Sequence, residues 1–470
     1  MSDRKMVVES RNTNDFKDMR HGAFNSLTRG CREMFLASVF FLFILSIGLP
    51  AQEAGPKVVA EVLYLEANGH FNRGQYARAI ERYNTFLLKF PGHPKKINVQ
   101  YGLGLSHFQL KKYQEAAVNL SEVLKDKGCP DVPRASYFLG QSLLKAGKYE
   151  AAEKALSSGL NALVEPPADA KGLAQFQELH RSLKISRLDA LVRQKKWEAV
   201  VRESDALEGK VDEHSLQVSF QGALARYELK HFKEAADAFD LLCKSHKGKI
   251  PNDQYQHAQI YLGRSYLEYG KINDAQKVFT LMVNEVGANS EVYLWQGRVF
   301  YRQGKYAEAG KCITDALGKF PADERVPEML FDLAGSFIAQ KKFIDAIVPL
   351  DRLLREYKNF NQWNDALRHN ALCKHHTKQF AASLILCELF LSGFKDSKYA
   401  AEVQFLEAEN YNYLGQSDKA ISAYKMFLKD HPKTIHHAHA QVQLGMLQCE
   451  MKDYQTARAT LSQVWALEQH

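Results

Sequence analysis

Residues 290–321 decide the fold, and they read SEVYLWQGRVFYRQGKYAEAGKCITDALGKFP. Apolar and small side chains recur at helical spacing on both sides of the segment Gly-Lys-Tyr-Ala-Glu-Ala at 304–309. A glycine followed by a polar residue marks a turn between two such stretches. The segment therefore predicts two antiparallel helices joined by a short turn.

This turn segment recurs along the chain. Similar sequences lie at 74–79, 111–116 and 147–152, and weaker copies lie at 230–235, 341–346 and 452–457. The aromatic residue of the segment sets a register in which nine of eleven positions are aromatic: Tyr76, Tyr113, Tyr149, Trp197, Phe232, Ile272, Tyr306, Phe343, Phe380, Ser417 and Tyr454. Most steps are 34 to 40 residues, a period typical of two-helix repeats.

Small residues occupy two further positions of each repeat. Nine residues before the aromatic, ten of the eleven positions hold Gly or Ala, and three residues after it nine hold Ala. Two helices that pack closely need small side chains where their axes come nearest. The pattern therefore predicts a tight helix pair in each repeat.

These positions resemble the tetratricopeptide repeat (TPR) family. The repeat from Ser290 to Pro321 matches its pattern best, at Gly297, Phe300, Tyr306, Ala309, Ala316 and Pro321. The resemblance covers residues 60–470. It implies an all-α fold, a right-handed α-solenoid of about eleven TPR-like helix-turn-helix repeats.

The register falters before Trp197. The step to this residue is 48, and residues 164–172 contain two prolines, two alanines and a glycine, a composition typical of a linker. Leu188 and Ser204 depart from the repeat pattern as well. We expect repeats 1–3 over 55–163, a linker over 164–180 and repeats 4–11 over 181–470, with an irregular fourth repeat.

The amino-terminal residues 1–51 resemble an export signal. Seven Lys and Arg precede MFLASVFFLFILSIGL at 34–49, which carries no charge and is followed by Pro50 and Ala51. Basic residues, an apolar core and small residues at a cleavage point are the order of a signal peptide. Sixteen apolar residues are short for a membrane-spanning helix. We expect cleavage after Ala51 or Ala54; the alternative is an uncleaved signal anchor. Both place the rest of the chain outside the cytoplasmic membrane, in the periplasm or cell envelope.

The distribution of charge and of cysteine argues against a nucleic-acid-binding protein and against a cysteine-based metal site. The net charge is +8, and Lys and Arg are interspersed with Asp and Glu, so we expect no nucleic-acid partner. The seven cysteines show no metal-ligand spacing. Cys373 and Cys387 fall on the two helices of one repeat, which leaves a disulfide between them open.

The chain lacks sequence motifs of catalysis. There is no glycine-rich phosphate loop, no GxSxG and no HExxH. His431, His436, His437 and His439 straddle a helix start, so their rings need not converge on a metal. We therefore expect no enzyme activity, no cofactor and no metal site.

The resemblance implies that the first helix of each repeat lines a concave surface for peptides. Carried over by position, the partner-binding residues would be Tyr101, Phe108, Tyr227, Arg264, Arg298, Tyr301 and Arg302, with Leu105 and Glu228 beside them. Aromatic and Arg side chains often anchor interfaces, and this set suits an acidic peptide. Asn68 resembles a residue of the chaperone-binding clamp, but Tyr64 replaces the clamp lysine, so we reject that function.

The expected function is a non-enzymatic scaffold or adaptor for proteins or peptide segments in the bacterial cell envelope. The alternative is a carrier or regulatory subunit for a secreted hydrolase or cell-wall enzyme. A membrane contact is expected only through residues 34–49, if they stay attached.

Overall fold

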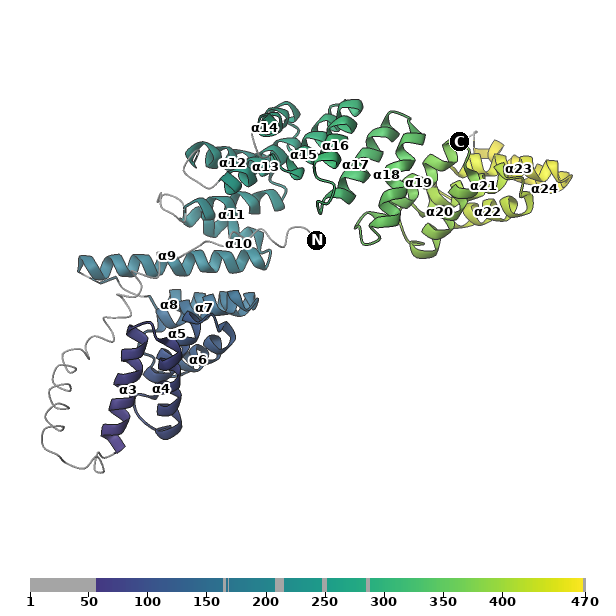
Figure 1. Ribbon diagram of the computed structural model, residues 1–470. Helices are drawn as coiled ribbons and strands as arrows, with labels where there is room; N and C mark the ends of the chain where they lie inside the picture. Colours follow the sequence, from purple (N-terminus) through teal and green to yellow (C-terminus); the bar gives the residue numbers. More distant parts are fainter. Residues whose placement is uncertain are drawn as a thin grey trace, which may run out of the picture. The chain divides into compact units, whose positions relative to one another are not determined.

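The computed structural model describes residues 56–163, 166–167, 169–207, 215–246, 252–284 and 288–467, and these residues contain 22 helices and no strand. The predicted leader, residues 1–51, lies outside the described residues. The helices form two compact units, residues 1–251 and 252–470, and each is an all-α helical-repeat solenoid (Figure 1).

Unit 1 contains five helix pairs. Its helices are α3 (Pro56–Asn72), α4 (Tyr76–Lys89), α5 (Lys96–Gln109), α6 (Tyr113–Lys125), α7 (Val132–Lys145), α8 (Tyr149–Asn161), α9 (Ala170–Arg193), α10 (Trp197–Leu207), α11 (Ser215–Glu228) and α12 (Phe232–His246). Each helix packs against the next one along the chain, and the odd-numbered helices also contact one another.

Unit 2 contains six pairs. Its helices are α13 (Asn252–Glu268), α14 (Ile272–Asn284), α15 (Ser290–Arg302), α16 (Tyr306–Lys319), α17 (Val326–Ala339), α18 (Phe343–Glu356), α19 (Trp363–His376), α20 (Phe380–Gly393), α21 (Ala400–Tyr413), α22 (Ser417–Asp430), α23 (His437–Glu450) and α24 (Tyr454–Leu467). We call the odd-numbered helix of each pair the A helix and the even-numbered one the B helix.

The predicted register is confirmed in all eleven described pairs. Every B helix begins at the residue that the sequence places in the aromatic position, from Tyr76 to Tyr454. The two small positions are buried in every pair, and Ala309 is fully inaccessible. A Cβ added to Gly263 would lie 2.5 Å from the Phe279 ring, and one added to Gly140 would lie 2.4 Å from Leu156 Cγ. The small residue of the A helix therefore makes room for a large one on its B helix.

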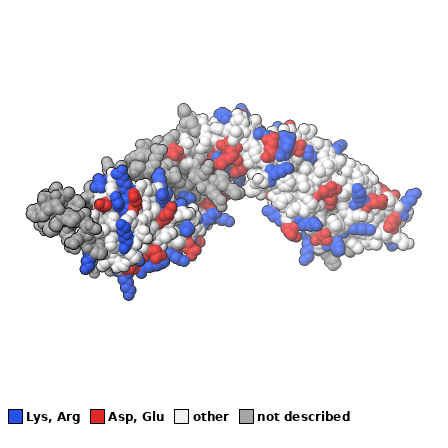
Figure 2. Space-filling view, turned by 60° about the horizontal axis from the view of Figure 1, so that its bottom comes forward, with Lys and Arg blue, Asp and Glu red and all other residues white. Residues whose placement is uncertain are grey.

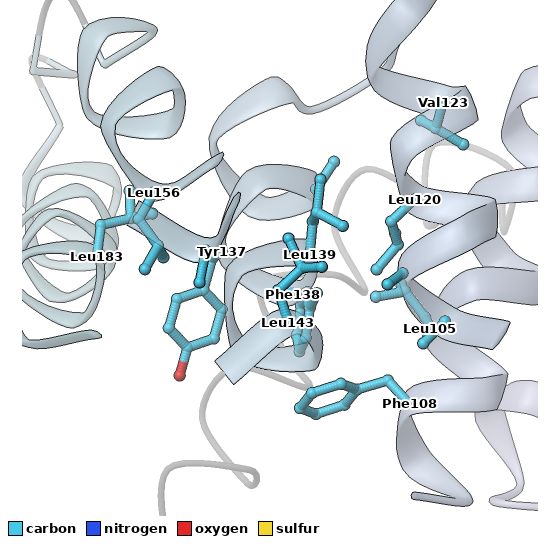
Figure 3. Close-up of a cluster of buried hydrophobic side chains, with 14 of the residues drawn as sticks. Leu105, Phe108, Leu120, Val123, Tyr137, Phe138, Leu139, Leu143, Leu156 and Leu183 are labelled. Carbon is cyan, nitrogen blue, oxygen red and sulfur yellow. The ribbon is translucent and has the colours of Figure 1, made fainter. Parts of the chain in front are cut away.

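The core is a series of such contacts between successive repeats. Figure 3 shows one cluster in unit 1, in which Phe108 of α5 lies against Phe138 of α7 with ring centroids 5.2 Å apart. Leu156 and Leu183 extend the same cluster toward α9. Because each repeat buries apolar side chains mainly against its neighbours, stability is built up locally along the chain.

The turn between the A and B helices has one fixed backbone conformation. Two residues before each B helix, φ is positive in all eleven described turns. Five turns use glycine there and six use lysine: Lys111, Lys195, Lys230, Lys341, Lys378 and Lys452. Side chains with a Cβ disfavour this left-handed conformation, so the lysines cost stability that glycine would not.

Replacing Lys341 with glycine is therefore expected to stabilise unit 2 by about 1 kcal/mol. The backbone already has φ 60° at this position, and the side chain is exposed. Urea unfolding of Lys341→Gly measures the effect. Lys311→Gly in the middle of α16 serves as the control and should lose about 1 kcal/mol. Equal losses in both variants would contradict the assignment of the strained turn.

The fourth repeat is irregular, as predicted, but residues 164–180 are not a linker throughout. α9 runs over Ala170–Arg193 and is 24 residues long, so residues 170–180 are helical. Asp169 begins the helix, because its side chain accepts a hydrogen bond from the Gly172 amide at 2.8 Å. Leu179 and Leu183 of α9 are buried against repeat 3. This continuous core keeps repeats 3 and 4 in one unit, whereas the two compact units divide at residues 251 and 252.

Leu188 and Ser204, which depart from the pattern, are both fully buried. They occupy the positions where other repeats place a small and a large residue, respectively. The fourth repeat thus reverses the sizes at this pair of positions. Gly222 of α11 lies close to Ser204, since a Cβ added to it would be 2.4 Å from Ser204 Oγ.

Candidate functional site

The A helices α13 and α15 carry an array of stacked arginine and aromatic side chains. The Trp295 ring lies between two guanidinium groups, with Arg264 at 4.7 Å and Arg298 at 4.6 Å from its centroid. Arg264 also lies 4.5 Å from the Tyr261 ring. Guanidinium groups are attracted to aromatic faces, and Trp gives the strongest such contact. The array holds both arginines in defined positions.

Arg298 is neutralised by two carboxylates of the next A helix. Its Nε donates to Asp332 at 2.6 Å, and its Nη2 donates to Glu328 at 3.0 Å. Burial alone would lower the pKa of Arg298, but Asp332 and Glu328 raise it above its ordinary value. Burial raises the pKa of Asp332 even though Arg298 opposes that shift. The Arg298 guanidinium therefore links α15 to α17 through these two hydrogen-bonded ion pairs.

Glu291 makes the matching contacts at the start of α15. Its carboxylate lies 3.8 Å from Arg264 of α13 and 3.2 Å from Arg325, which directly precedes α17. The side chain is about one-tenth exposed, so this is a largely desolvated network. These ion pairs tie three successive repeats together in a fixed register.

The same kind of contact continues along unit 2. Arg368 of α19 donates to Glu402 of α21 at 2.9 Å, and its guanidinium lies 4.3 Å from the Tyr399 ring. Phe405 stacks on His436 with centroids 4.7 Å apart. Residue pairs about one repeat apart in the sequence thus meet on adjacent A helices.

Three predicted site residues form a structural contact inside their own repeats. Phe108 packs edge-on against Tyr113, Tyr227 against Phe232, and Tyr301 against Tyr306, with centroids 5.1 to 5.7 Å apart. Each pair joins the end of an A helix to the first residue of its B helix. Such edge-to-face pairs stabilise the turn.

Of the predicted residues, Glu228, Tyr301 and Arg302 are the ones that the structure leaves exposed. Tyr301 is 41% exposed, and the Arg302 side chain is 57% exposed. Arg302 Nη2 lies 3.9 Å from Glu268, at the end of α13. By contrast Tyr101, Leu105 and Phe108 are buried. Tyr101 and Leu105 lie in the same core cluster as Phe108.

The predicted residues also belong to different units. Tyr101, Phe108, Tyr227 and Glu228 lie in unit 1, and Arg264, Arg298, Tyr301 and Arg302 lie in unit 2. The structure therefore describes the two groups separately. Arg264 and Arg298 do come together, on the two faces of Trp295. Tyr301 and Arg302 follow Arg298 on α15, where Tyr301 contacts Tyr306 and Arg302 approaches Glu268.

Sequence analysis missed Trp295, Glu291, Glu328 and Asp332 as parts of this surface. A signal was present, because Glu291 and Arg325, and likewise Arg298 and Asp332, are opposite charges 34 residues apart. In a repeat of that period, residues with this separation lie on adjacent A helices. Comparing charges across repeats, and not within one, would have found them.

The cysteines and Asn68, which the sequence analysis also considered, make contacts within the repeats. Cys373 and Cys387 are buried free thiols, and burial raises the pKa of each to about 12. Asn68 accepts a hydrogen bond from the Tyr83 hydroxyl at 2.6 Å, which links α3 to α4. Among the described residues, no three His, Cys, Asp or Glu side chains are placed to hold a metal ion. No described helix is both long and apolar enough to cross a bilayer.

Charges of both signs are mixed on the described part of the face drawn in Figure 2. On the described part of that face, Lys and Arg alternate with Asp and Glu. The sequence expectation of interspersed charge agrees with this view.

Structures of several repeat proteins are similar to parts of the chain. A tetratricopeptide repeat protein from Cytophaga hutchinsonii is 16% identical, with 55% of this chain and 98% of that one covered and a TM-score of 0.45. One from Parabacteroides merdae is 16% identical, covering 59% and 98%, with a TM-score of 0.35. Yeast Tom70 is 14% identical, covering 87% and 92%, with a TM-score of 0.32. No curated protein sequence matches the chain.

Two family models, both described as tetratricopeptide repeat, match more than half of the chain. One matches residues 64–120, 101–165, 261–324 and 294–359, and the other matches 402–434 and 439–467. Proteins of this kind are generally non-enzymatic modules for protein–protein interaction. By its eleven helix pairs, their shared register and these matches, the chain belongs to the tetratricopeptide repeat family.

Proposed function

We propose that this protein is a non-enzymatic scaffold of the bacterial cell envelope, and that unit 2 binds an acidic peptide segment of a partner on the ends of α13 and α15. The binding surface would consist of Tyr269, Tyr301 and Arg302. Tyr269 is 44% exposed and follows α13, next to Glu268, which Arg302 approaches.

One observation carries this proposal: an exposed tyrosine and an exposed arginine sit beside an array that is rigid and already neutralised. Trp295 and nearby carboxylates hold Arg264 and Arg298 in place, so these arginines link α13, α15 and α17. Their positive charges are neutralised by the chain's own carboxylates. The Arg302 guanidinium lies 3.9 Å from the Glu268 carboxylate, which is a long ion pair. It can therefore turn to a carboxylate of a bound peptide at small cost.

Photo-crosslinking tests the surface. A benzophenone amino acid in place of Tyr301 should capture a partner in intact cells. The same group in place of Lys311, an exposed residue of α16, should not. Arg302→Glu should reduce the adduct at position 301 by about tenfold, since it places a negative charge against an acidic segment. Equal adducts at 301 and 311, or no effect of Arg302→Glu, would refute the proposed surface.

The proposed location has its own test. Amino-terminal sequencing of the protein from cell envelopes should start near Gln52 or Gly55 if the leader is cleaved. An intact amino terminus in the membrane fraction would support the anchor, and protein found in the cytosol with an intact terminus would refute the location. This result is independent of whether position 301 contacts a partner.

A further inference from the structure

The edge of unit 1 at which α3 begins has an unusual combination of side chains. Three loops or helix ends meet there: the first turn of α3, the connection between α4 and α5, and the connection between α6 and α7. The two connections line one hollow, whose lining includes His93 and Lys96 of the first and Lys125 and Gly128 of the second. Contacts of Lys95 join the first connection to α3. Lys95 Nζ lies 2.5 Å from Glu61 and 4.8 Å from the Tyr64 ring, and Phe86 packs against His93 at 5.2 Å. We call residues 56–59, 88–97 and 125–131 the α3 edge.

Exposed aliphatic side chains mark this edge. Leu88, at the end of α4, is 83% exposed, and Val58 of α3 is 54% exposed. Val59 and Val62, on the same two turns of α3, are each 37% exposed. Isolated exposed aliphatics are common, but several at one end of a unit are a feature of interaction surfaces.

Lysines are frequent in the same segments, and two of them are ion-paired, Lys95 with Glu61 and Lys125 with Glu122. The α3 edge contains six lysines and two aspartates: Lys57, Lys89, Lys95, Lys96, Lys125, Lys127, Asp126 and Asp131. Asp131 is already used, because it caps α7 by accepting from the Arg134 amide at 3.0 Å. Apolar side chains together with lysines fit the boundary between the headgroups and acyl chains of an anionic bilayer.

The sequence before α3 favours a bilayer over a protein as the occupant. Six residues, 50–55, separate the uncharged run at 34–49 from Pro56, where α3 begins. Six residues span at most about 20 Å. If that run enters a membrane, the α3 edge follows it most closely along the chain. The exposed valines of the edge would then meet acyl chains, and its lysines would meet anionic headgroups.

We propose that the α3 edge of unit 1 lies on an anionic lipid surface, with Leu88 and Val58 in contact with lipid and the lysines in contact with phosphate headgroups. The inference deepens the proposed envelope location and does not depend on the peptide surface of unit 2. In the protein that keeps the apolar run, membrane contact has two parts, the run and the folded surface, and together they orient the first repeat on the bilayer; in the cleaved protein the α3 edge alone makes the contact.

The test uses the full-length protein in vesicles that contain fluorescent phosphatidylglycerol in phosphatidylcholine. A benzophenone amino acid replaces Leu88 or, as a matched control, Val118, which is 64% exposed in the middle of α6. The expected result is a lipid adduct at position 88 that is about tenfold stronger than the adduct at 118. Equal adducts at the two positions overturn the proposal, and so does a crosslink from position 88 to a second copy of the chain.

The lysines are tested in the same assay. The triple variant with Lys89→Gln, Lys96→Gln and Lys127→Gln should lower the adduct at position 88 by about tenfold or more, because each lysine near an anionic surface adds to binding. The matched triple at the opposite edge, Lys111→Gln, Lys112→Gln and Lys148→Gln, should leave it unchanged. Equal effects of the two triples would show general charge attraction and overturn the assignment of this edge. The assay contains no partner protein, so its failure is distinguishable from failure of the peptide surface.

Discussion

Replacing Phe279 with alanine is expected to lower the free energy of unfolding of unit 2 by about 3–5 kcal/mol. Phe279 of α14 is fully buried and fills the space that Gly263 leaves on α13. Removing the ring leaves a cavity between the two helices, and the backbone of a close helix pair can collapse only partly into it. Urea unfolding monitored by circular dichroism measures the loss.

The same contact predicts a coupling between the two positions. Gly263→Ala alone should cost about 1–3 kcal/mol, because its Cβ would lie 2.5 Å from the ring of Phe279. In the double variant with Phe279→Ala, the added methyl group no longer meets a ring. The combined loss should therefore be smaller than the sum of the two single losses by about 1 kcal/mol or more.

Gly335→Ala provides the control for the glycine substitution. Gly335 lies within α17, and a Cβ added there would meet nothing within 4 Å. Alanine is the better helix former by about 1 kcal/mol, so this variant should be stabilised. Strictly additive losses at 263 and 279, or a loss at 335 as large as that at 263, would contradict the packing described for the repeat.

Replacing Arg298 with methionine is expected to cost unit 2 about 2–3 kcal/mol at neutral pH. Methionine keeps the apolar stem but leaves Asp332 and Glu328 without their guanidinium partner. The contact with the Trp295 ring is lost as well. The loss should stay below that of a fully buried pair, because about a quarter of each side chain of the Arg298–Asp332 pair is exposed.

This loss should depend on pH in a defined direction. Burial already raises the pKa of Asp332, and removal of Arg298 takes away the charge that opposes this shift. A carboxyl whose pKa is higher in the folded state destabilises the fold when it is ionised, and the penalty fades as pH falls to the unfolded value of about 4. The deficit of Arg298→Met should therefore shrink between pH 7 and pH 4.5.

Arg302→Met is the matched control, since Arg302 lies four residues further along the same helix and is mostly exposed. Its effect should stay within about 0.5 kcal/mol at every pH. A deficit of Arg298→Met that is constant with pH, or equal to that of Arg302→Met, would show that Arg298 does not compensate a buried carboxylate.

The sequence predicted the repeat unusually well because the repeat is a local structure. Tyr306, Gly297 and Ala309 lie within thirteen residues of one another, and their spacing alone specifies a tight helix pair. Even the two positions without an aromatic, Ile272 and Ser417, begin their B helices as predicted, because the surrounding turn keeps the register. The cell-envelope location, the partner and the bacterial source remain predictions.

The candidate surface was predicted less well, because it depends on contacts between repeats. The sequence pattern predicted that Arg264 and Arg298 bind a partner. In the structure, Glu291, Glu328 and Asp332 of the chain itself already neutralise them. Likewise Phe108 and Tyr227 are used to close their own turns. Pattern alone gives the face of a helix but not the side chains that an adjacent helix presents to it.

By itself the sequence determined the helix pairs, the first residue of each B helix and the family, since each depends on residues within one repeat. Only the tertiary structure decided that α9 is a long helix buried on repeat 3, that the chain divides into units at residue 251, and which cations stay exposed. The physical reason is that burial and neutralisation are properties of packed neighbours. A side chain 34 residues away can decide whether an arginine binds a partner or holds the solenoid together.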